Sequence, residues 1–178
     1  MPKTRPGLRL SRYQVLALQA DKSPDKTLAF PLLGLFGEAG SLLSVVKKKQ
    51  RDRAAYLGYA PNVVEELGDV LWYFTVVAAR GGVHLADIGN NLESDLSDWK
   101  KTGASHLRFR DLQTKARKPR DKPTPAFEKT LLNLAGEIGI VLADHQASRF
   151  NRNRDALRGL LVAVMRTLVK AADEAGSR

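Results

Sequence analysis

The chain has 178 residues, of which 43% are hydrophobic, so a folded core is expected and global disorder is not. It has no cysteine, which excludes disulfides, zinc–thiolate sites and cysteine nucleophiles, and its three scattered histidines argue against a histidine-built zinc site. The formal net charge of +10 suggests anionic partners such as nucleotides or nucleic acid.

No uninterrupted apolar run approaches the roughly 20 residues that a membrane-spanning helix needs. The N-terminal segment, MPKTRPGLRLSRYQ, is basic and lacks the apolar core of a secretory signal. We therefore expect a cytoplasmic protein without a membrane partner.

Four helices are predicted in the first hundred residues, because apolar side chains recur there at helical spacing. The third of them should stop at Gly81 and Gly82, since glycine is the usual residue after a helix end. The expected bounds are residues 10–20, 27–50, 61–79 and 87–100. No strand-like alternation appears anywhere, so the pattern predicts an all-α fold, an antiparallel four-helix bundle with short connections.

Positive charge is concentrated between residues 100 and 122. This segment holds nine lysines and arginines against Asp111 and Asp121, and so supplies +7 of the net charge. We interpret residues 101–125 as a basic linker. The alternative is a nucleic-acid-binding site, which we favour less because only Phe109 adds an aromatic ring among the cations.

Helical patterning resumes over residues 126–178, which we interpret as a helical hairpin. The segment AFEKTLLNLAGEIG (126–139) resembles AFPLLGLFGEAG (29–40), since both place an apolar run before G-E-x-G. The hairpin is therefore interpreted as a degenerate repeat that keeps Glu137 but has no acidic pair on its last helix. The alternative is a coincidental likeness between two amphipathic helices.

The segment NVVEELGDVLWYF (62–74) carries the most informative acids. Glu66 and Asp69 are three residues apart and share a helix face, and Glu65 lies within reach of Asp69. No cation follows on this helix before Arg80, so these carboxylates lack a local partner. Together with Glu38 they could form an all-oxygen site, which favours Mg²⁺, with Mn²⁺ as an alternative. Spacing alone equally permits a solvent-facing acidic stripe.

The chain from about Tyr13 to Trp99 resembles the MazG-like all-α nucleoside triphosphate pyrophosphohydrolases, which include the all-α dimeric dUTPases. The resemblance lies in G-E-x-G, KKKQRD, E-L-G-D-V-L-W-Y and a terminal N-L, found in this order. It implies a MazG-like domain over residues 1–100 and a cytoplasmic hydrolase of nucleotide metabolism. A homodimer is expected if the likeness of the second half is a coincidence, whereas a true repeat would let one chain supply both halves of a bundle that relatives assemble from two chains. The implied reaction is the Mg²⁺-dependent cleavage of a nucleoside triphosphate to its monophosphate and pyrophosphate.

The family signature is an ExxE on one helix and an ExxD on the next. By this resemblance Glu38, Glu66 and Asp69 are the catalytic and metal-binding residues. Ser41 stands where the second acid of the ExxE is expected, and could contact the metal weakly or through water, as could Glu65.

The resemblance also implies substrate-binding residues. Lys47 and Lys48 match the basic pair that faces phosphate oxygens, and Asn91 matches an asparagine of the last helix. Ser94 stands where many relatives have a phosphate-binding lysine. The replacements at Ser41 and Ser94 keep a second hypothesis open, in which the chain is a catalytically weakened nucleotide-binding or regulatory module. The base and sugar of the substrate are not determined by any residue.

Overall fold

The computed structural model of the chain describes residues 7–93, 107–113, 118–151 and 153–177. Its helices are α1 (Leu10–Ala20), α2 (Ala29–Asp52), α3 (Tyr59–Arg80), α4 (Leu85–Glu93), α5 (Phe109–Leu112), α6 (Pro125–Gln146) and α7 (Arg154–Ala175). Short 3₁₀ turns follow α2 and α6, and these ranges contain no strand. The prediction of an all-α fold is confirmed.

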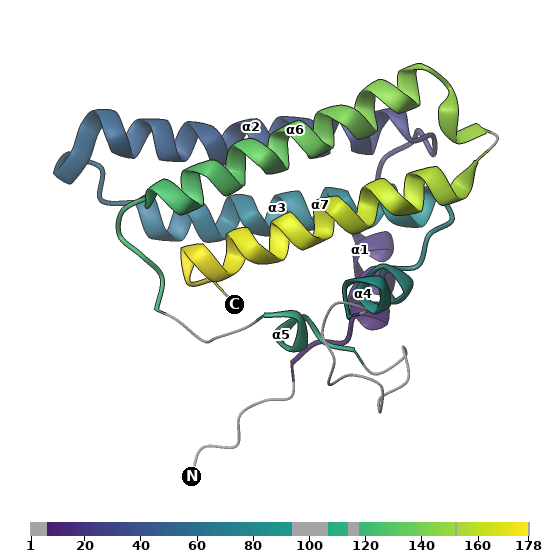
Figure 1. Ribbon diagram of the computed structural model, residues 1–178, viewed down its shortest axis with the longest axis horizontal. Coiled ribbons are helices and arrows are strands. Elements are labelled where there is room, and N and C mark those ends of the chain that lie inside the picture. Colours follow the sequence, from purple (N-terminus) through teal and green to yellow (C-terminus); the bar gives the residue numbers. More distant parts are fainter. Residues whose placement is uncertain (1–6, 94–106, 114–117, 152, 178) are drawn as a thin grey trace, which may run out of the picture.

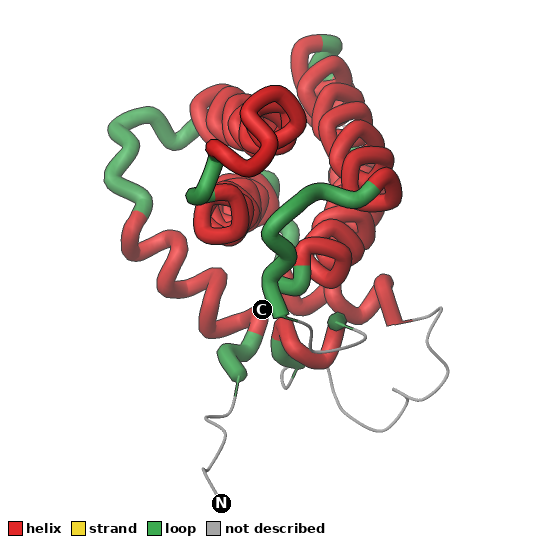
Figure 2. The backbone as a smooth tube through the Cα atoms, turned by 90° about the vertical axis from the view of Figure 1, so that its left-hand side faces the viewer, coloured by secondary structure: helices red, strands yellow, loops and turns green. Residues whose placement is uncertain are grey.

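The four long helices α2, α3, α6 and α7 lie side by side, and each runs antiparallel to its two neighbours (Figure 1). Figure 2 shows the same helices nearly end-on, with α1 and α4 against one side. The bundle thus takes two helices from each half of the chain, whereas helical periodicity alone had placed all four in the first hundred residues. The helix predicted at 87–100 is α4 as far as residue 93, and its remainder lies outside the described ranges.

Local signals explain where the later bundle helices begin and end. Thr124 caps α6, its hydroxyl accepting the amide hydrogen of Phe127 at 3.2 Å, with a proline as the next residue. Asn153 caps α7 in the same way, accepting the amide hydrogen of Ala156 at 3.1 Å. Gly176 follows α7 with φ of 75°, a conformation that favours glycine. Both α6 and α7 therefore begin at a side-chain cap, and α7 ends at a glycine.

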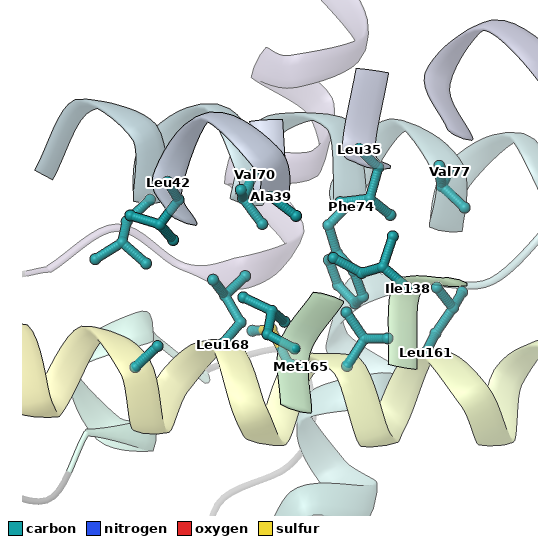
Figure 3. Packing of buried hydrophobic residues seen from close by; sticks show 14 of the residues in the cluster. Leu35, Ala39, Leu42, Val70, Phe74, Val77, Ile138, Leu161, Met165 and Leu168 are labelled. Carbon is teal, nitrogen blue, oxygen red and sulfur yellow. The ribbon is translucent and has the colours of Figure 1, made fainter. Parts of the chain in front are cut away.

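One continuous core joins the two halves of the chain (Figure 3). Its side chains recur at helical spacing on each helix, and a fully buried Leu or Phe contributes about 1.5–3 kcal/mol to folding. Representative members are Leu35, Ala39 and Leu42 of α2, Val70, Phe74 and Val77 of α3, Ile138 of α6, and Leu161, Met165 and Leu168 of α7. The hairpin of the second half is therefore part of the same packed body as α2 and α3.

The helix α2 with the turn that follows it, Ala29–Ala55, is long and apolar enough to cross a membrane, judged by length and composition only. Its mean hydropathy reaches 1.6 over 18 residues. Core helices of bundles meet the same criterion, and one face of α2 is buried against α3 and α6.

A buried glutamine joins α1 to the start of α4. Gln14 donates to the carbonyl oxygen of Val83 at 3.3 Å, and its own side-chain oxygen accepts the amide hydrogen of Leu85 at 2.9 Å. Both of its polar ends are satisfied, which a buried amide requires. Residues 107–112, inside the segment interpreted as a basic linker, also pack here, with Leu107 and Leu112 buried in the core.

A buried ion pair attaches the loop between α1 and α2 to the C-terminal end of α3. Arg80 lies 2.5 Å from Asp21, and the two side chains are only 7% and 5% exposed. Arg80 also donates to the carbonyl oxygens of Asp25 and Thr27, at 2.8 and 2.7 Å. Burial alone would raise the pKa of Asp21, but the hydrogen bond and charge of Arg80, with further help from Ser23 and Lys26, outweigh it and lower that pKa.

The close contact of α2 with α3 depends on Gly34. A methyl group at this position would overlap the ring of Tyr73, which also packs edge-on against Trp72 at 4.7 Å between centroids.

We expect Gly34→Ala to lower the free energy of unfolding by about 1–3 kcal/mol, measured by urea denaturation. The matched control is Gly37→Ala, since no atom lies within 4 Å of the added methyl there. It should raise stability by about 0.5–1 kcal/mol, and equal effects of the two substitutions would contradict this account.

Candidate metal centre

Three carboxylates from two helices meet on one side of the bundle. Glu38 comes from α2, and Glu66 and Asp69 come from successive turns of α3. One oxygen from each lies within 4.8 Å of the other two. The i, i+3 spacing places the two α3 acids on one face, and the packing of α2 on α3 brings Glu38 to that face. Glu38 and Glu66 are partly buried, whereas Asp69 is exposed.

The electrostatics of this group favour a cation. Burial raises the pKa of Glu66, and the charges of Glu38, Asp69 and Glu65, together with a hydrogen bond to Glu38, raise it further. Within the part of the chain that the structure describes, no lysine or arginine forms an ion pair with the three acids. Gathered negative charge without a protein partner is costly, and a bound cation would relieve that cost.

The donor set fits a hard divalent cation. Carboxylate oxygens are the ligands that Mg²⁺, Ca²⁺ and Mn²⁺ take, whereas zinc sites in proteins usually include nitrogen or sulfur donors. Three acids leave further coordination positions for water and substrate, as a hydrolytic site requires. The identity of the ion stays a prediction.

Two further predicted contacts, Ser41 and Glu65, come from the same two helices as this group. Ser41 is half-buried on α2, one turn after Glu38, and therefore on a neighbouring part of the same helix face. Glu65 is exposed, and it acts on Glu66 through its charge without belonging to the group of three.

The residues predicted to bind substrate are not drawn into the acidic group. The ammonium of Lys48 lies 4.6 Å above the ring of Tyr56, and Lys47 is exposed near the end of α2. The Asn91 amide donates to the carbonyl oxygen of Asp87 at 2.7 Å, within α4. Ser94 lies outside the described residues. The roles of Lys47, Lys48 and Asn91 stay predictions.

The sequence did not indicate that Tyr13 of α1 lies near the acidic group, where the charge of Asp69 acts on its phenol. Its phenol is partly buried, and burial followed by the negative charge of Asp69 raises its pKa. Phe109 packs edge-on against the ring, with centroids 5.1 Å apart, and so helps to hold it. Tyr13 fits the apolar spacing of α1, and no local signal distinguishes it from an ordinary packing residue.

The positions of α6 and α7 that correspond to the three acids in the predicted repeat carry a different set of residues, and the repeat itself stays a prediction. Glu137 of α6 occupies the same place in G-E-x-G as Glu38, and it hydrogen-bonds to Thr167 of α7 as Glu38 does to Glu66. Lys170 follows Thr167 by three residues, as Asp69 follows Glu66. Burial raises the pKa of Glu137, against the opposing effects of Thr167 and Arg166. At these three positions α6 and α7 have one acid, whereas α2 and α3 have three.

Comparison with known proteins identifies a phage relative. The chain is 32% identical over 78 residues to "Gene 37 protein" of Mycobacterium phage L5, an alignment that covers 43% of this chain and 68% of the relative. No protein-family model matches the chain, and no solved structure matches it.

Proposed function

The chain belongs to the same family as Gene 37 protein of Mycobacterium phage L5, and because that name states no activity, we propose a function from the site itself. We propose that it is a divalent-metal-dependent pyrophosphohydrolase, which cleaves a nucleoside triphosphate to the monophosphate and pyrophosphate. The observation that carries this proposal is the convergence of Glu38, Glu66 and Asp69 within 4.8 Å on two packed helices. The MazG-like resemblance of the first hundred residues supports the choice of substrate.

The acids of such a site would bind the metal and handle the attacking water. Glu38, Glu66 and Asp69 would hold the metal, with Mg²⁺ expected first and Mn²⁺ as the alternative. When bound, the cation would offset charge on the phosphates and acidify a water molecule. The chain's carboxylates would orient the attacking water or accept its proton, while water attacks the α-phosphorus and the bond to the β-phosphate oxygen breaks.

A second candidate function rests on Ser41. A serine at this place supplies no charge, so a metal would be held by three acids instead of four. On this alternative the chain binds nucleotide without turning it over, and acts as a regulatory module. The two functions differ in one measurement, which is product release.

The experiment is a nucleotide panel. The purified chain is incubated with each common ribo- and deoxyribonucleoside triphosphate in Mg²⁺, in Mn²⁺ and in EDTA, and pyrophosphate is measured with an enzyme-coupled assay. The proposal expects metal-dependent release of pyrophosphate, in equal amount to monophosphate, from at least one nucleotide. Calorimetric binding without any product supports the regulatory alternative, and neither binding nor product refutes both.

An acid introduced at position 41 tests whether the Mg²⁺ affinity of the site depends on its number of carboxylates. We expect Ser41→Glu to tighten Mg²⁺ binding by about tenfold, because cation affinity rises with the number of ligand charges. The same substitution should lower the metal-free melting temperature, since it adds a fourth negative charge. Both quantities follow from thermal unfolding at increasing Mg²⁺.

The control for Ser41→Glu is Ser44→Glu, which adds the same charge at an exposed position of α2 one turn further on. It should leave Mg²⁺ binding within about twofold. If both variants bind Mg²⁺ equally, Ser41 does not face the metal.

A further inference from the structure

A basic groove lies at the end of the bundle where α2 stops and α6 begins. A cavity of about 350 Å³ opens there, with walls from two separate segments of the chain. Its lining residues are Lys49, Gln50, Arg53, Ala54, Asp121, Lys122 and Pro123. We propose that this groove binds the phosphate backbone of a nucleic acid, a role separate from nucleotide hydrolysis at the acidic site.

Positive charge is dense on both walls. Residues 47–53 and 118–122 hold eight lysines and arginines, against Asp52 and Asp121. Lys49 and Arg53 of the first segment and Lys122 of the second line the cavity, so cations some 70 positions apart in the sequence lie around one groove. Cations spread along a groove match a polymer with regularly spaced phosphates.

Of the three cations that line the cavity, Lys49, Arg53 and Lys122, two remain for a ligand once the protein's own contacts are assigned. Lys49 donates to the carbonyl oxygen of Tyr56 at 2.8 Å, and Arg51 pairs with Asp52 at 2.6 Å. Arg53 and Lys122 are exposed, line the cavity, and form no ion pair with a described residue. They are the side chains best placed to take phosphate oxygens.

The second wall is held in place by backbone contacts. Arg120 donates its amide hydrogen to the carbonyl oxygen of Ala175 at 3.0 Å, and its guanidinium donates to that of Glu174 at 2.9 Å. These bonds anchor the segment before α6 to the end of α7. The backbone of this wall is therefore already in position, which lowers part of the entropic cost of association.

The lining chemistry favours a backbone over a single nucleotide. Nucleotide pockets usually offer an aromatic or other large apolar wall for the base, whereas the apolar residues that line this cavity are Ala54 and Pro123. Here the neighbouring rings of Tyr56 and Tyr59 are 9% and 3% exposed, and so cannot stack on a base from solution. Contacts to phosphates without contacts to bases predict binding that is insensitive to sequence and steeply dependent on salt.

Fluorescence anisotropy with a labelled single-stranded oligonucleotide of about 20 bases, at 50–200 mM salt, tests this proposal. We expect the double variant Arg53→Gln with Lys122→Gln to bind about tenfold more weakly at 50 mM salt. The slope of log K against log salt should shrink by about 1.4, since each lost phosphate contact to a single strand removes about 0.7. The matched control is Lys22→Gln with Arg149→Gln, which removes two exposed charges elsewhere and should leave binding unchanged.

Several outcomes would overturn the proposal. They are no binding by the wild-type chain at 50 mM salt, equal binding by the two double variants, or a double variant that loses nucleoside triphosphate hydrolysis instead of oligonucleotide binding. The proposal does not depend on the hydrolytic function, because Glu66→Gln should bind the oligonucleotide as the wild-type chain does. Circular dichroism confirms that each variant is folded.

Discussion

Replacing Glu66 by glutamine is expected to reduce metal-dependent pyrophosphate release by about 10²- to 10⁴-fold, the range found when a positioned acid–base group is lost. The substitution keeps the size of the side chain and removes one of three converging carboxylates. The measurement is single-turnover release of pyrophosphate at saturating Mg²⁺.

The same substitution should make the metal-free protein more stable. The folded state raises the pKa of Glu66, so the wild-type fold loses stability as pH rises from the unfolded pKa of about 4.3 through the folded value. Glutamine does not ionise, and the difference in melting temperature should therefore grow across this pH range and stay constant above it. Added Mg²⁺ should narrow the difference, because the cation stabilises the wild-type site.

The control for Glu66→Gln is Glu65→Gln, which removes an equal charge from the adjacent, exposed position outside the group of three. We expect its activity to stay within about threefold of wild type. Full activity in Glu66→Gln would show that the acidic site does not take part in catalysis. Loss of activity in Glu65→Gln would show that Glu65 does.

The second large effect concerns stability. Replacing Arg80 by methionine is expected to lower the free energy of unfolding by about 3–5 kcal/mol, because it removes the buried cation 2.5 Å from the carboxylate of Asp21 and leaves only the exposed Lys26, at 3.9 Å. It also removes the donor to the carbonyl oxygens of Asp25 and Thr27, which holds the α1–α2 connection in place. Urea unfolding at pH 7 measures the loss.

The Asp21–Arg80 pair is expected to stabilise the fold more than other ion pairs because both of its side chains are buried. Arg149 also pairs with an acid, Asp144, at 2.6 Å, but its side chain is 67% exposed. Arg149→Met should therefore cost less than about 1 kcal/mol. Similar losses for Arg80→Met and Arg149→Met would show that burial of the Asp21–Arg80 pair carries no special weight.

The pH dependence of this pair has a definite sign. The folded state lowers the pKa of Asp21, so its contribution is present above the unfolded pKa of about 3.9 and is lost as pH falls through the folded value. The stability difference between wild type and Asp21→Asn should therefore be constant at neutral pH and disappear in acid.

Several local features followed directly from the order of residues. The bounds of α1 were predicted correctly, and those of α2 and α3 within two residues, because apolar spacing and glycine or proline signals act within a few turns of a helix. The pairing of Glu66 with Asp69 needs only the helical repeat. Glu38 was expected to join them, and the structure brings its oxygen within 4.8 Å.

Other features depended on contacts between segments far apart in the chain. Gln14, Tyr13 and Arg80 were missed because each acts on residues that only the packing of helices brings near: Gln14 holds the start of α4, Tyr13 lies near Asp69, and Arg80 closes the loop at Asp21. The groove between Arg53 and Lys122 has the same origin.

Helix positions and the acids on one helix face are local properties, since the α-helical repeat relates residues three and four apart. Which helices share a core is a different matter. Amphipathic helices from either half can bury the same kind of apolar face, and only the summed packing of α2, α3, α6 and α7 selected one bundle with two helices from each half. That packing sets Glu38 against Glu66 and Asp69 in the first hairpin, and Glu137 against Thr167 in the second.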